Sequence, residues 1–356
     1  MVAPSRVSMT TMKTLFTLPA FAVLAALSLP GCDGVASAAS TESRLLLIPG
    51  EAGGHIALHC EQPKAKTSAA VLFIHGASFP TLLASGFSFH PGDSWLAFTA
   101  HRGYVACGLD FPGFGASTKP PEMSQDPSGH TPLLRAPDAA AEIKRAVDYL
   151  RSNFHVQTVH VVAHSSGTIA AAEYAAEHPT GLTSLILFGP VVPRSPATQE
   201  STSKAWYPLR AADRYQQLKF KDVLPPGLDL LEPAVHTRWT EEFARSAGDS
   251  AGAASELHIP AGPLADLADA QRGVYPYDPT RVVVPLLAVY GDYDNVSTDP
   301  EVGAFLERFT SSPLRWRLVI AHGTHAMHLE RNRRSLYAAV GAFIHVVEAM
   351  PSTERK

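Results

Sequence analysis

The pentapeptide Ala163-His164-Ser165-Ser166-Gly167 stands between the apolar run 158–163 and the alanine-rich segment 167–177. The run predicts a strand buried on both faces, and the segment predicts a helix. A serine that protrudes from such a strand-to-helix turn needs small residues two positions to either side, because the backbone is pinched there. Ala163 and Gly167 meet this need. The stretch predicts either an accessible nucleophile at Ser165 or a plain helix cap.

Apolar runs and helical patterns alternate on both sides of this turn. Strands separated by helices imply a mainly parallel sheet with helices on both faces, which is an α/β fold. We expect strands at 44–48, 55–59, 69–74, 104–109, 158–163, 183–188, 282–290 and 314–320, and helices at 95–101, 137–153, 167–177, 300–309 and 332–348.

The alternation stops between residues 192 and 280. This segment is rich in Pro, Arg, Asp and Gln, carries several Trp and Tyr residues, and shows helical rather than strand patterns. A structureless loop of that length does not fit a compact domain, so we interpret 192–280 as an inserted helical lid. The lid separates two parts of the core, 43–191 and 281–350, and residues 351–356 form a tail.

Three further stretches follow the same order as in a known family. His75-Gly76-Ala77 follows an expected strand, Gly291-Asp292-Tyr293-Asp294 follows another, and the segment 321–330 with His325 follows the last. Together with the serine turn, the chain resembles the α/β-hydrolase family, although Ala163 replaces the first glycine of its G-x-S-x-G signature. Asp110-Phe-Pro-Gly-Phe-Gly-Ala-Ser117 also matches a loop of this family, and we interpret it as structural.

The resemblance implies a role for each of these residues. Ser165 would be the nucleophile, His325 the base and Asp294 the orienting acid, in the chain order of this fold. Asp292 is the alternative acid, because acid loops tolerate small shifts. The backbone N–H groups of Ala77 and Ser166 would form the oxyanion hole.

The spacing of His322, His325 and His328 also admits a metal site on one side of a tight turn. Such a site would normally include a carboxylate or thiolate and an H-E-x-x-H motif, which this segment lacks. We therefore expect no metal and no other cofactor, and interpret His328 as a structural residue.

The amino-terminal segment predicts export. Residues 1–32 contain two basic residues and no acid before an apolar run that is too short to span a bilayer, which is typical of a signal peptide. Leu29-Pro-Gly-Cys32 resembles a bacterial lipobox, so Cys32 is the expected lipidation site, with 33–42 as a tether to the membrane. Cleavage after Ala38 is the alternative, and Met9 and Met12 are alternative starts.

Composition excludes some partners. The formal net charge of the whole chain is -4 and no long basic run is present, so nucleic acid is not an expected partner. Cys60 and Cys107, in or beside expected strands, either pair in an oxidising compartment or remain buried thiols.

The sequence thus predicts an exported serine hydrolase that cleaves a carboxylic ester of a small to mid-sized, partly apolar substrate through an acyl-enzyme. An amide or lactone hydrolase with the same triad is one alternative. A non-catalytic ligand-binding lipoprotein on the same scaffold is another. Ser165 argues against relatives that use an aspartate at the elbow to open epoxides or displace halide. The sequence indicates neither the natural substrate nor the oligomeric state.

Overall fold

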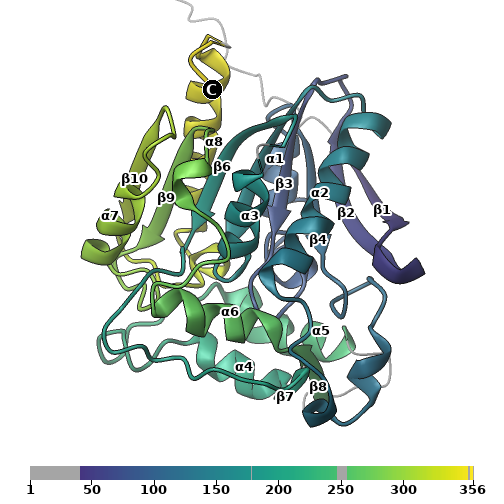
Figure 1. Cartoon of the computed structure of the whole chain (residues 1–356), viewed down its shortest axis with the longest axis vertical. Helices are drawn as coiled ribbons and strands as arrows, with labels where there is room; N and C mark the ends of the chain where they lie inside the picture. Colours follow the sequence, from purple (N-terminus) through teal and green to yellow (C-terminus); the bar gives the residue numbers. More distant parts are fainter. Residues whose placement is uncertain (1–40, 178, 247–254, 352, 356) are drawn as a thin grey trace, which may run out of the picture. The chain divides into compact units, whose positions relative to one another are not determined.

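The computed structural model describes residues 41–177, 179–246, 255–351 and 353–355. The expected signal segment with Cys32, and the tether up to residue 40, lie outside these residues. The described chain is built around an eight-stranded sheet (Figure 1). None of the helices in this part is long and apolar enough to cross a bilayer.

The sheet is mainly parallel, as expected. Its strand order is β1-β2-β4-β3-β5-β6-β9-β10, and every pair from β4 to β10 is parallel, whereas β2 is antiparallel to both of its neighbours. The continuous apolar runs become the central strands because both of their faces are covered. The strands are β1 Thr41–Pro49, β2 His55–Pro63, β3 Ala69–Ile74, β4 Val105–Asp110, β5 Thr158–His164, β6 Leu182–Phe188, β9 Leu286–Gly291 and β10 Arg315–Ile320.

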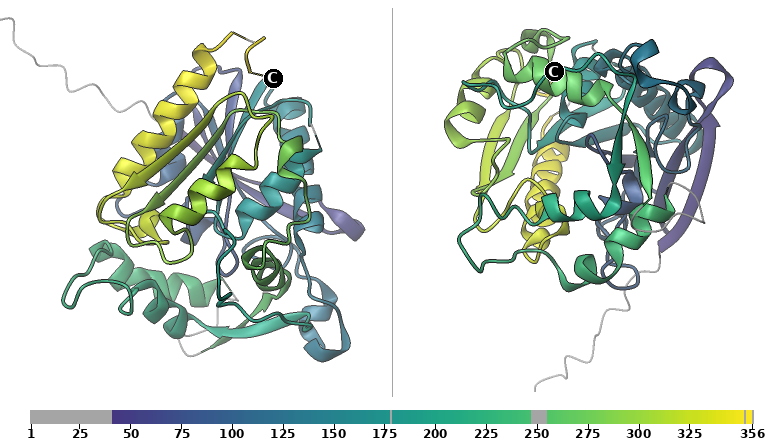
Figure 2. Two further views of the ribbon diagram at one scale, coloured as in Figure 1. Left: turned by 60° about the vertical axis from the view of Figure 1, so that its left-hand side comes forward. Right: turned by 90° about the horizontal axis from the view of Figure 1, so that it is seen from below.

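Helices cover the two faces of the sheet (Figures 1 and 2). One face packs against α2 Ala136–Asn153, α3 Gly167–Ala176 and α7 Asp299–Glu307, and the other packs against α1 Trp95–Ala100 and α8 Arg333–Ala349. Successive residues of β3 alternate between these layers, so that Leu72 joins the first core and Phe73 the second. The α/β architecture with helices on both faces is confirmed.

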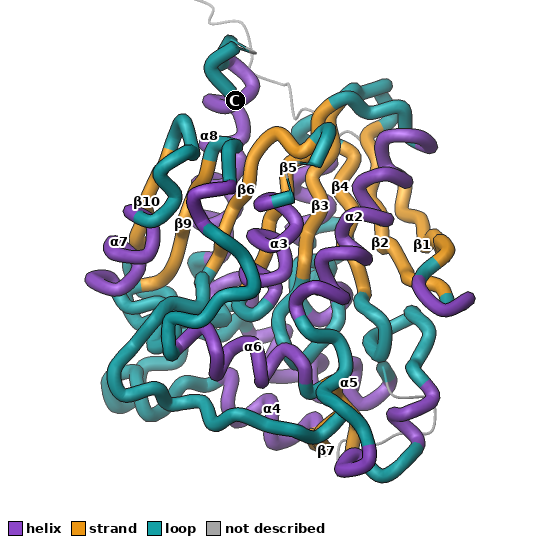
Figure 3. The backbone as a smooth tube through the Cα atoms, in the orientation of Figure 1, coloured by secondary structure: helices purple, strands orange, loops and turns teal. Residues whose placement is uncertain are grey.

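The segment 192–280 lies along one end of the sheet (Figure 3) and contains α4 Ala211–Leu218, α5 Thr240–Arg245 and α6 Gly262–Gln271. It also contains a two-stranded antiparallel ribbon, which the helical expectation missed, formed by β7 Trp206–Arg210 and β8 Glu256–Pro260. The short helical turns are Glu51–Gly53, Thr81–Leu83, Pro121–Ser124, Pro127–Gly129, Val235–Trp239, Pro279–Arg281 and Met327–Leu329.

Of the two possibilities for Cys60 and Cys107, the structure contains the disulfide. The two residues are directly opposite each other in the antiparallel pairing of β2 with β4. The bond therefore joins the antiparallel edge of the sheet to its parallel centre.

Candidate active site

Ser165 lies on a sharp turn between β5 and α3. Its φ of 55° falls in the left-handed region, and its N–H donates to the carbonyl of Phe188 on the neighbouring strand at 3.0 Å. A side chain at Gly167 would place its Cβ 2.5 Å from the carbonyl oxygen of His75, so only glycine fits there. The apolar strand and the small residue after the turn thus hold a serine in a strained, defined position.

The structure brings Ser165, His325 and Asp294 together. His325 Nε2 is 2.8 Å from Ser165 Oγ, and His325 Nδ1 is 3.0 Å from each carboxylate oxygen of Asp294. The exposed fractions of the three residues are 8, 7 and 5%, respectively. A hydroxyl, an imidazole and a carboxylate in series, shielded from water, can activate the hydroxyl as a nucleophile.

Asp294, not Asp292, faces the imidazole. Its Oδ1 accepts the backbone N–H groups of Val296 and Ser297 at 2.8 and 2.9 Å, which fixes the carboxylate. Asp292 is exposed, and its Oδ1 accepts the N–H of Gly323 at 3.2 Å.

Close backbone contacts align the acid loop with the histidine loop. The N–H of Tyr293 donates to the carbonyl of Gly323 at 2.9 Å, and a Cβ at Gly291 would lie 1.9 Å from the same oxygen. Gly189 has a φ of 58°, and a Cβ there would lie 2.9 Å from His325 Nδ1. Sequence reasoning missed Gly189, because nothing local in the sequence indicates which residues a glycine faces.

Two backbone N–H groups stand beside the nucleophile without an acceptor. Within the described residues, the N–H groups of Ala77 and Ser166 form no hydrogen bond. The loop of Ala77 lies against the elbow, since a Cβ at Gly76 would lie 3.0 Å from Ser165 Cβ. Buried N–H groups are normally paired, so two free donors here suit an oxyanion that forms only during a reaction.

His75 orients one of these donors. Its Nδ1–H donates to the carbonyl of Gly76 at 2.7 Å, while its Nε2 accepts the N–H of Phe111 at 3.3 Å. Burial lowers the pKa of His75, which keeps the ring neutral so that one nitrogen can donate and the other accept. The Gly76 carbonyl and the Ala77 N–H belong to one trans peptide, so fixing the carbonyl also fixes the N–H in the opposite direction. The His-Gly pair is the signal that could have revealed this role.

The Asp110 loop is structural, as expected from the sequence. Asp110 is fully buried and accepts hydrogen bonds from His59 at 2.8 Å and from the N–H of Thr81 at 2.8 Å. Burial alone would raise the pKa of Asp110, but His59, His75 and the N–H of Thr81 together outweigh burial, and the net pKa is lowered. A Cβ at Gly115 would lie 2.0 Å from the Asp110 carboxylate, so the second glycine of the motif lets the loop close around this acid.

The histidines spaced every three residues do not share one environment. His322 is exposed, whereas His328 is 2% exposed and burial lowers its pKa to about 3. His328 packs against His164, with 4.7 Å between ring centroids. The Nε2–H of His164 donates to the carbonyl of His325 at 2.8 Å, which supports the loop of the base. No cluster of three or more potential metal ligands occurs among the described residues.

The lid is tied directly to the histidine loop. The N–H of Glu232 donates to the carbonyl of Leu329 at 3.1 Å, and the N–H of Arg331 donates to that of Leu230 at 2.9 Å. Arg333, at the start of α8, pairs with Glu232. These bonds fix the lid over the end of the sheet where the candidate triad lies.

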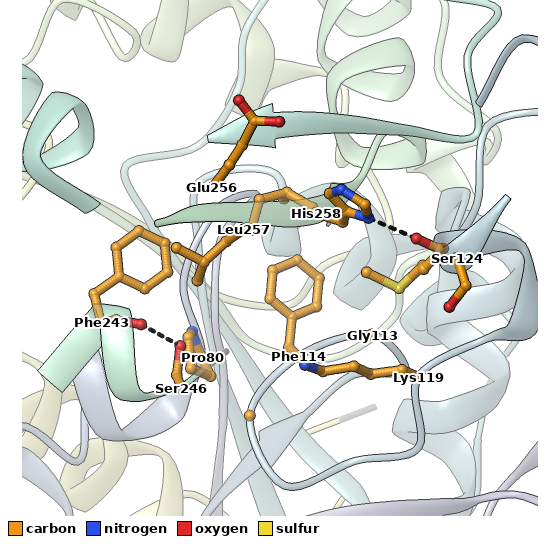
Figure 4. Close-up of a pocket in the computed structure, with 13 residues that line it drawn as sticks. Pro80, Gly113, Phe114, Lys119, Ser124, Phe243, Ser246, Glu256, Leu257 and His258 are labelled. Atoms are coloured by element: carbon orange, nitrogen blue, oxygen red, sulfur yellow. Dashed lines mark hydrogen bonds between the residues drawn. The ribbon is translucent and has the colours of Figure 1, made fainter. Parts of the chain in front are cut away.

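A cavity of about 250 Å³ opens between the lid and the loop after β4 (Figure 4). Leu257 and Ile259 of β8 line one side, and Phe114 and Met123 line the other. Phe114 also packs against His75, with 4.7 Å between ring centroids. The cavity therefore lies beside the expected oxyanion loop, and none of the three triad residues is part of its wall.

Residues 69–332 match the model of a protein family described as the alpha/beta hydrolase fold. Among curated proteins, the chain is 30% identical over 198 residues to "Probable lysophospholipase BODYGUARD 2" of Arabidopsis thaliana, a match that covers 53% of this chain and 34% of that protein. The chain thus spans about a third of the length of this relative.

Solved structures show the same fold at low sequence identity. The thioesterase domain from the curacin biosynthetic pathway superposes with a TM-score of 0.55 and 17% identity, covering 86% of this chain and 99% of that one. CarC, a serine hydrolase involved in carbazole degradation, has a TM-score of 0.55, 17% identity and coverages of 86 and 100%. The Pyrococcus furiosus esterase Pf2001 has a TM-score of 0.54, 15% identity and coverages of 87 and 92%.

Proposed function

Because the chain belongs to the α/β-hydrolase fold family, we propose that it is a serine hydrolase that cleaves a carboxylic ester of a small to mid-sized, partly apolar substrate. The observation that carries this proposal is the hydrogen-bonded series from Ser165 through His325 to Asp294, with distances of 2.8 and 3.0 Å. Such a series at a strained elbow has a clear use in acyl transfer, where a serine must lose a proton while it attacks.

The proposed reaction has two halves. Ser165 Oγ attacks the ester carbonyl carbon while His325 Nε2 takes the hydroxyl proton, and Asp294 stabilises the imidazolium. The N–H groups of Ala77 and Ser166 hold the tetrahedral oxyanion, a contribution of several kcal/mol because these donors need not reorient. His325 then gives its proton to the leaving alcohol, and an acyl-enzyme remains. Water activated by His325 releases the acid and restores the serine.

The apolar part of the cavity wall beneath the lid supports a partly apolar substrate. The cavity beside the oxyanion loop is lined by Phe114, Met123, Leu257 and Ile259, and also by polar residues such as Lys119, Glu256 and His258. A short or medium acyl chain, rather than a long polymer, suits a space of this size.

The proposal is tested with the purified protein and a Ser165→Ala variant on chromogenic esters of graded acyl length. We expect the variant to keep its melting temperature and to lose at least roughly 10³-fold in kcat/KM. An organophosphonate should add its mass to the peptide that contains Ser165. Activity retained by the variant, or a label elsewhere, would overturn the proposal.

Matched esters, lactones and aminoacyl amides separate the related activities. Faster turnover of an amide or a lactone than of its matched ester would replace the ester assignment while keeping the triad. The absence of turnover on the whole panel, without phosphonate labelling, would favour a ligand-binding role.

We also propose that the protein acts outside the cytoplasm, tethered through a lipidated Cys32. The disulfide between Cys60 and Cys107 supports this proposal, since such bonds persist in oxidising compartments. Cell fractionation with mass spectrometry of the mature amino terminus tests it. A mature chain beginning at residue 39 would replace lipidation with ordinary cleavage, and a cytoplasmic, uncleaved chain would refute export.

A further inference from the structure

Arg214 of the lid helix α4 points inward, toward the core beneath the lid. Its guanidinium carbon lies 5.5 Å from the ring centre of Phe79, a residue that is 3% exposed and follows the Ala77 loop by two positions. Its Nη1 donates a hydrogen bond to Gln217 of the same helix, at 2.9 Å. The Nε atom is buried and has no hydrogen-bond partner within the described residues.

Within the described part of the chain, three other lid arginines have carboxylate partners, which Arg214 lacks. Arg210 pairs with Asp213 at 2.7 Å, Arg238 with Glu242 at 3.1 Å and Arg272 with Asp269 at 2.7 Å, all on the lid surface. Arg214 is half-buried, whereas these three residues are exposed, and among the described residues no carboxylate forms an ion pair with it. A partly desolvated guanidinium without a counter-charge is costly, and the contact with Phe79 and the bond to Gln217 offset that cost only in part.

A chain of ring contacts connects Arg214 to the candidate triad. Phe79 stacks on His328 with 6.2 Å between centroids, His328 packs on His164 at 4.7 Å, and His164 packs on His325 at 4.9 Å. His328 is 2% exposed, and in the described part of the chain neither of its ring nitrogens has a hydrogen-bond partner. A second unpaired polar side chain therefore lies between the guanidinium and the base.

The surrounding groups respond to this positive charge. Burial is the main cause of the lowered pKa values of His164 and His328, and Arg214 lowers both further. Burial also raises the pKa of Tyr207 on β7 to about 12, and Arg214 partly offsets that rise. The groups that interact electrostatically with Arg214 are thus neutral, so none of them compensates its positive charge, which can bind an anion.

We propose that Arg214 binds an anionic group of the ester substrate, a carboxylate or a phosphate located away from the bond that is cleaved. This inference rests on the proposed esterase function and specifies its substrate class. The planar fork of a guanidinium matches two oxygens of either anion, and the enclosed setting strengthens the bond. The preferred substrate is then an ester with one apolar part and one acidic part.

The test compares matched anionic and neutral substrates with the full chain. The carboxylate arm uses 4-nitrophenyl hydrogen glutarate against 4-nitrophenyl pentanoate. The phosphate arm uses a decanoylglycerol phosphate against decanoylglycerol. We expect the wild-type protein to favour the anionic member of at least one pair by roughly tenfold or more in kcat/KM. The arm that shows the preference identifies the source of the anion.

Arg214→Gln should abolish this preference and leave turnover of the neutral ester within about threefold of wild type. Arg210→Gln is the matched control, because it removes the same charge from the same part of the lid and should keep the preference. If Arg214→Gln does not fold, Arg214→Lys keeps the charge but not the planar fork, and it should weaken the anion preference by at least about threefold.

The possible results separate a failure of the Arg214 inference from a failure of the esterase proposal. No anion preference in either arm, a preference that survives Arg214→Gln, or one that Arg210→Gln removes equally would overturn this inference while the esterase proposal stands. If the glutamine variant does not fold, an anion preference that Arg214→Lys leaves unchanged would do the same. If wild type and Ser165→Ala are equally inactive on both neutral esters and both anionic esters, the esterase proposal itself fails.

Discussion

Replacing Asp294 with Asn tests the geometry of the candidate triad most directly. The N–H groups of Val296 and Ser297 both donate to Oδ1, so an amide at this position must keep its oxygen there. Its NH₂ group then takes the place of Oδ2, which lies 3.0 Å from His325 Nδ1. The NH₂ group then favours an imidazole with its proton on Nε2, in competition with donation from Nδ1–H to the retained oxygen at Oδ1, which also lies 3.0 Å from Nδ1.

The expected loss follows from that change of tautomer. With Nε2 protonated, His325 cannot accept the Ser165 proton across their 2.8 Å contact, and no negative charge remains to stabilise an imidazolium. A comparable substitution in a serine protease triad lowers kcat by about 10⁴, and we expect a loss of roughly 10³ to 10⁴ here. Because the carboxylate is replaced by an isosteric amide, the fold should be retained.

The assay is kcat on a chromogenic ester, with melting temperature as the check on folding. Asp292→Asn is the control, because the exposed Asp292 accepts only the N–H of Gly323 at 3.2 Å and an amide oxygen can replace it. We expect the control to stay within about threefold of wild type. A folded Asp294→Asn protein with more than a tenth of wild-type kcat, or an Asp292→Asn protein that loses more than Asp294→Asn, would refute the assignment.

Three further predictions concern residues around the candidate triad and elsewhere in the sheet. Burial raises the pKa of Glu330 from 4.5 to about 7. The contribution of this carboxyl to the free energy of unfolding is therefore greatest below pH 4.5 and decreases by about 3 kcal/mol as the pH rises to 7. Urea unfolding at pH 5 and 8 should show a smaller decrease in this free energy for Glu330→Gln than for wild type. The Cys60 to Cys107 disulfide closes a loop of 47 residues, and the double serine variant should lose about 2–4 kcal/mol in denaturant unfolding, whereas an unchanged midpoint would mean that the bond does not form. Gly189→Ala would place a methyl group 2.9 Å from His325 Nδ1, on a backbone in the left-handed region. We expect kcat to fall at least tenfold, while the melting temperature decreases by only a few degrees. A variant with wild-type kcat would contradict this prediction.

The parallel sheet could be predicted because each central strand is a continuous apolar run. The expected strand 69–74 coincides with β3, and 158–163 differs from β5 by one residue. Burial on both faces leaves such a run no other stable position, so its composition alone is informative. The elbow could be predicted because the strand, the small residues and the helix that mark it are contiguous in the sequence, although the contact that requires glycine at 167 is with the distant His75.

The lid ribbon could not be predicted in this way. β7 and β8 have five residues each, their partners are far apart in sequence, and Pro208 interrupts the first strand. The exposure pattern of β7 shows no clear alternation that would mark one face as buried. Pairing between distant short strands depends on where the rest of the lid places them, and that information is absent from either segment alone.

The sequence favoured Asp294 as the acid but left Asp292 as an alternative in the same loop. Asp292 and Asp294 lie two positions apart, and the choice between them depends on the two backbone donors of Val296 and Ser297, which hold only Asp294. The pairing of Cys60 with Cys107 likewise depends on β2 lying next to β4, a strand order that alternation of strands and helices leaves open. Both the choice of acid and the disulfide pairing depend on contacts that only the folded structure shows.

Neutral imidazoles explain how a buried site can hold so many histidines. Burial lowers the pKa of His75, His164 and His328, so each ring stays uncharged and adds no fixed positive charge near the base. His75 and His164 each use one ring N–H to hold a carbonyl, of Gly76 and of His325 respectively. Protonating either ring would add a second donor where the structure offers it no acceptor. The neutral rings thus act as rigid supports, and the positive charge of the reaction can form on His325 alone, opposite Asp294.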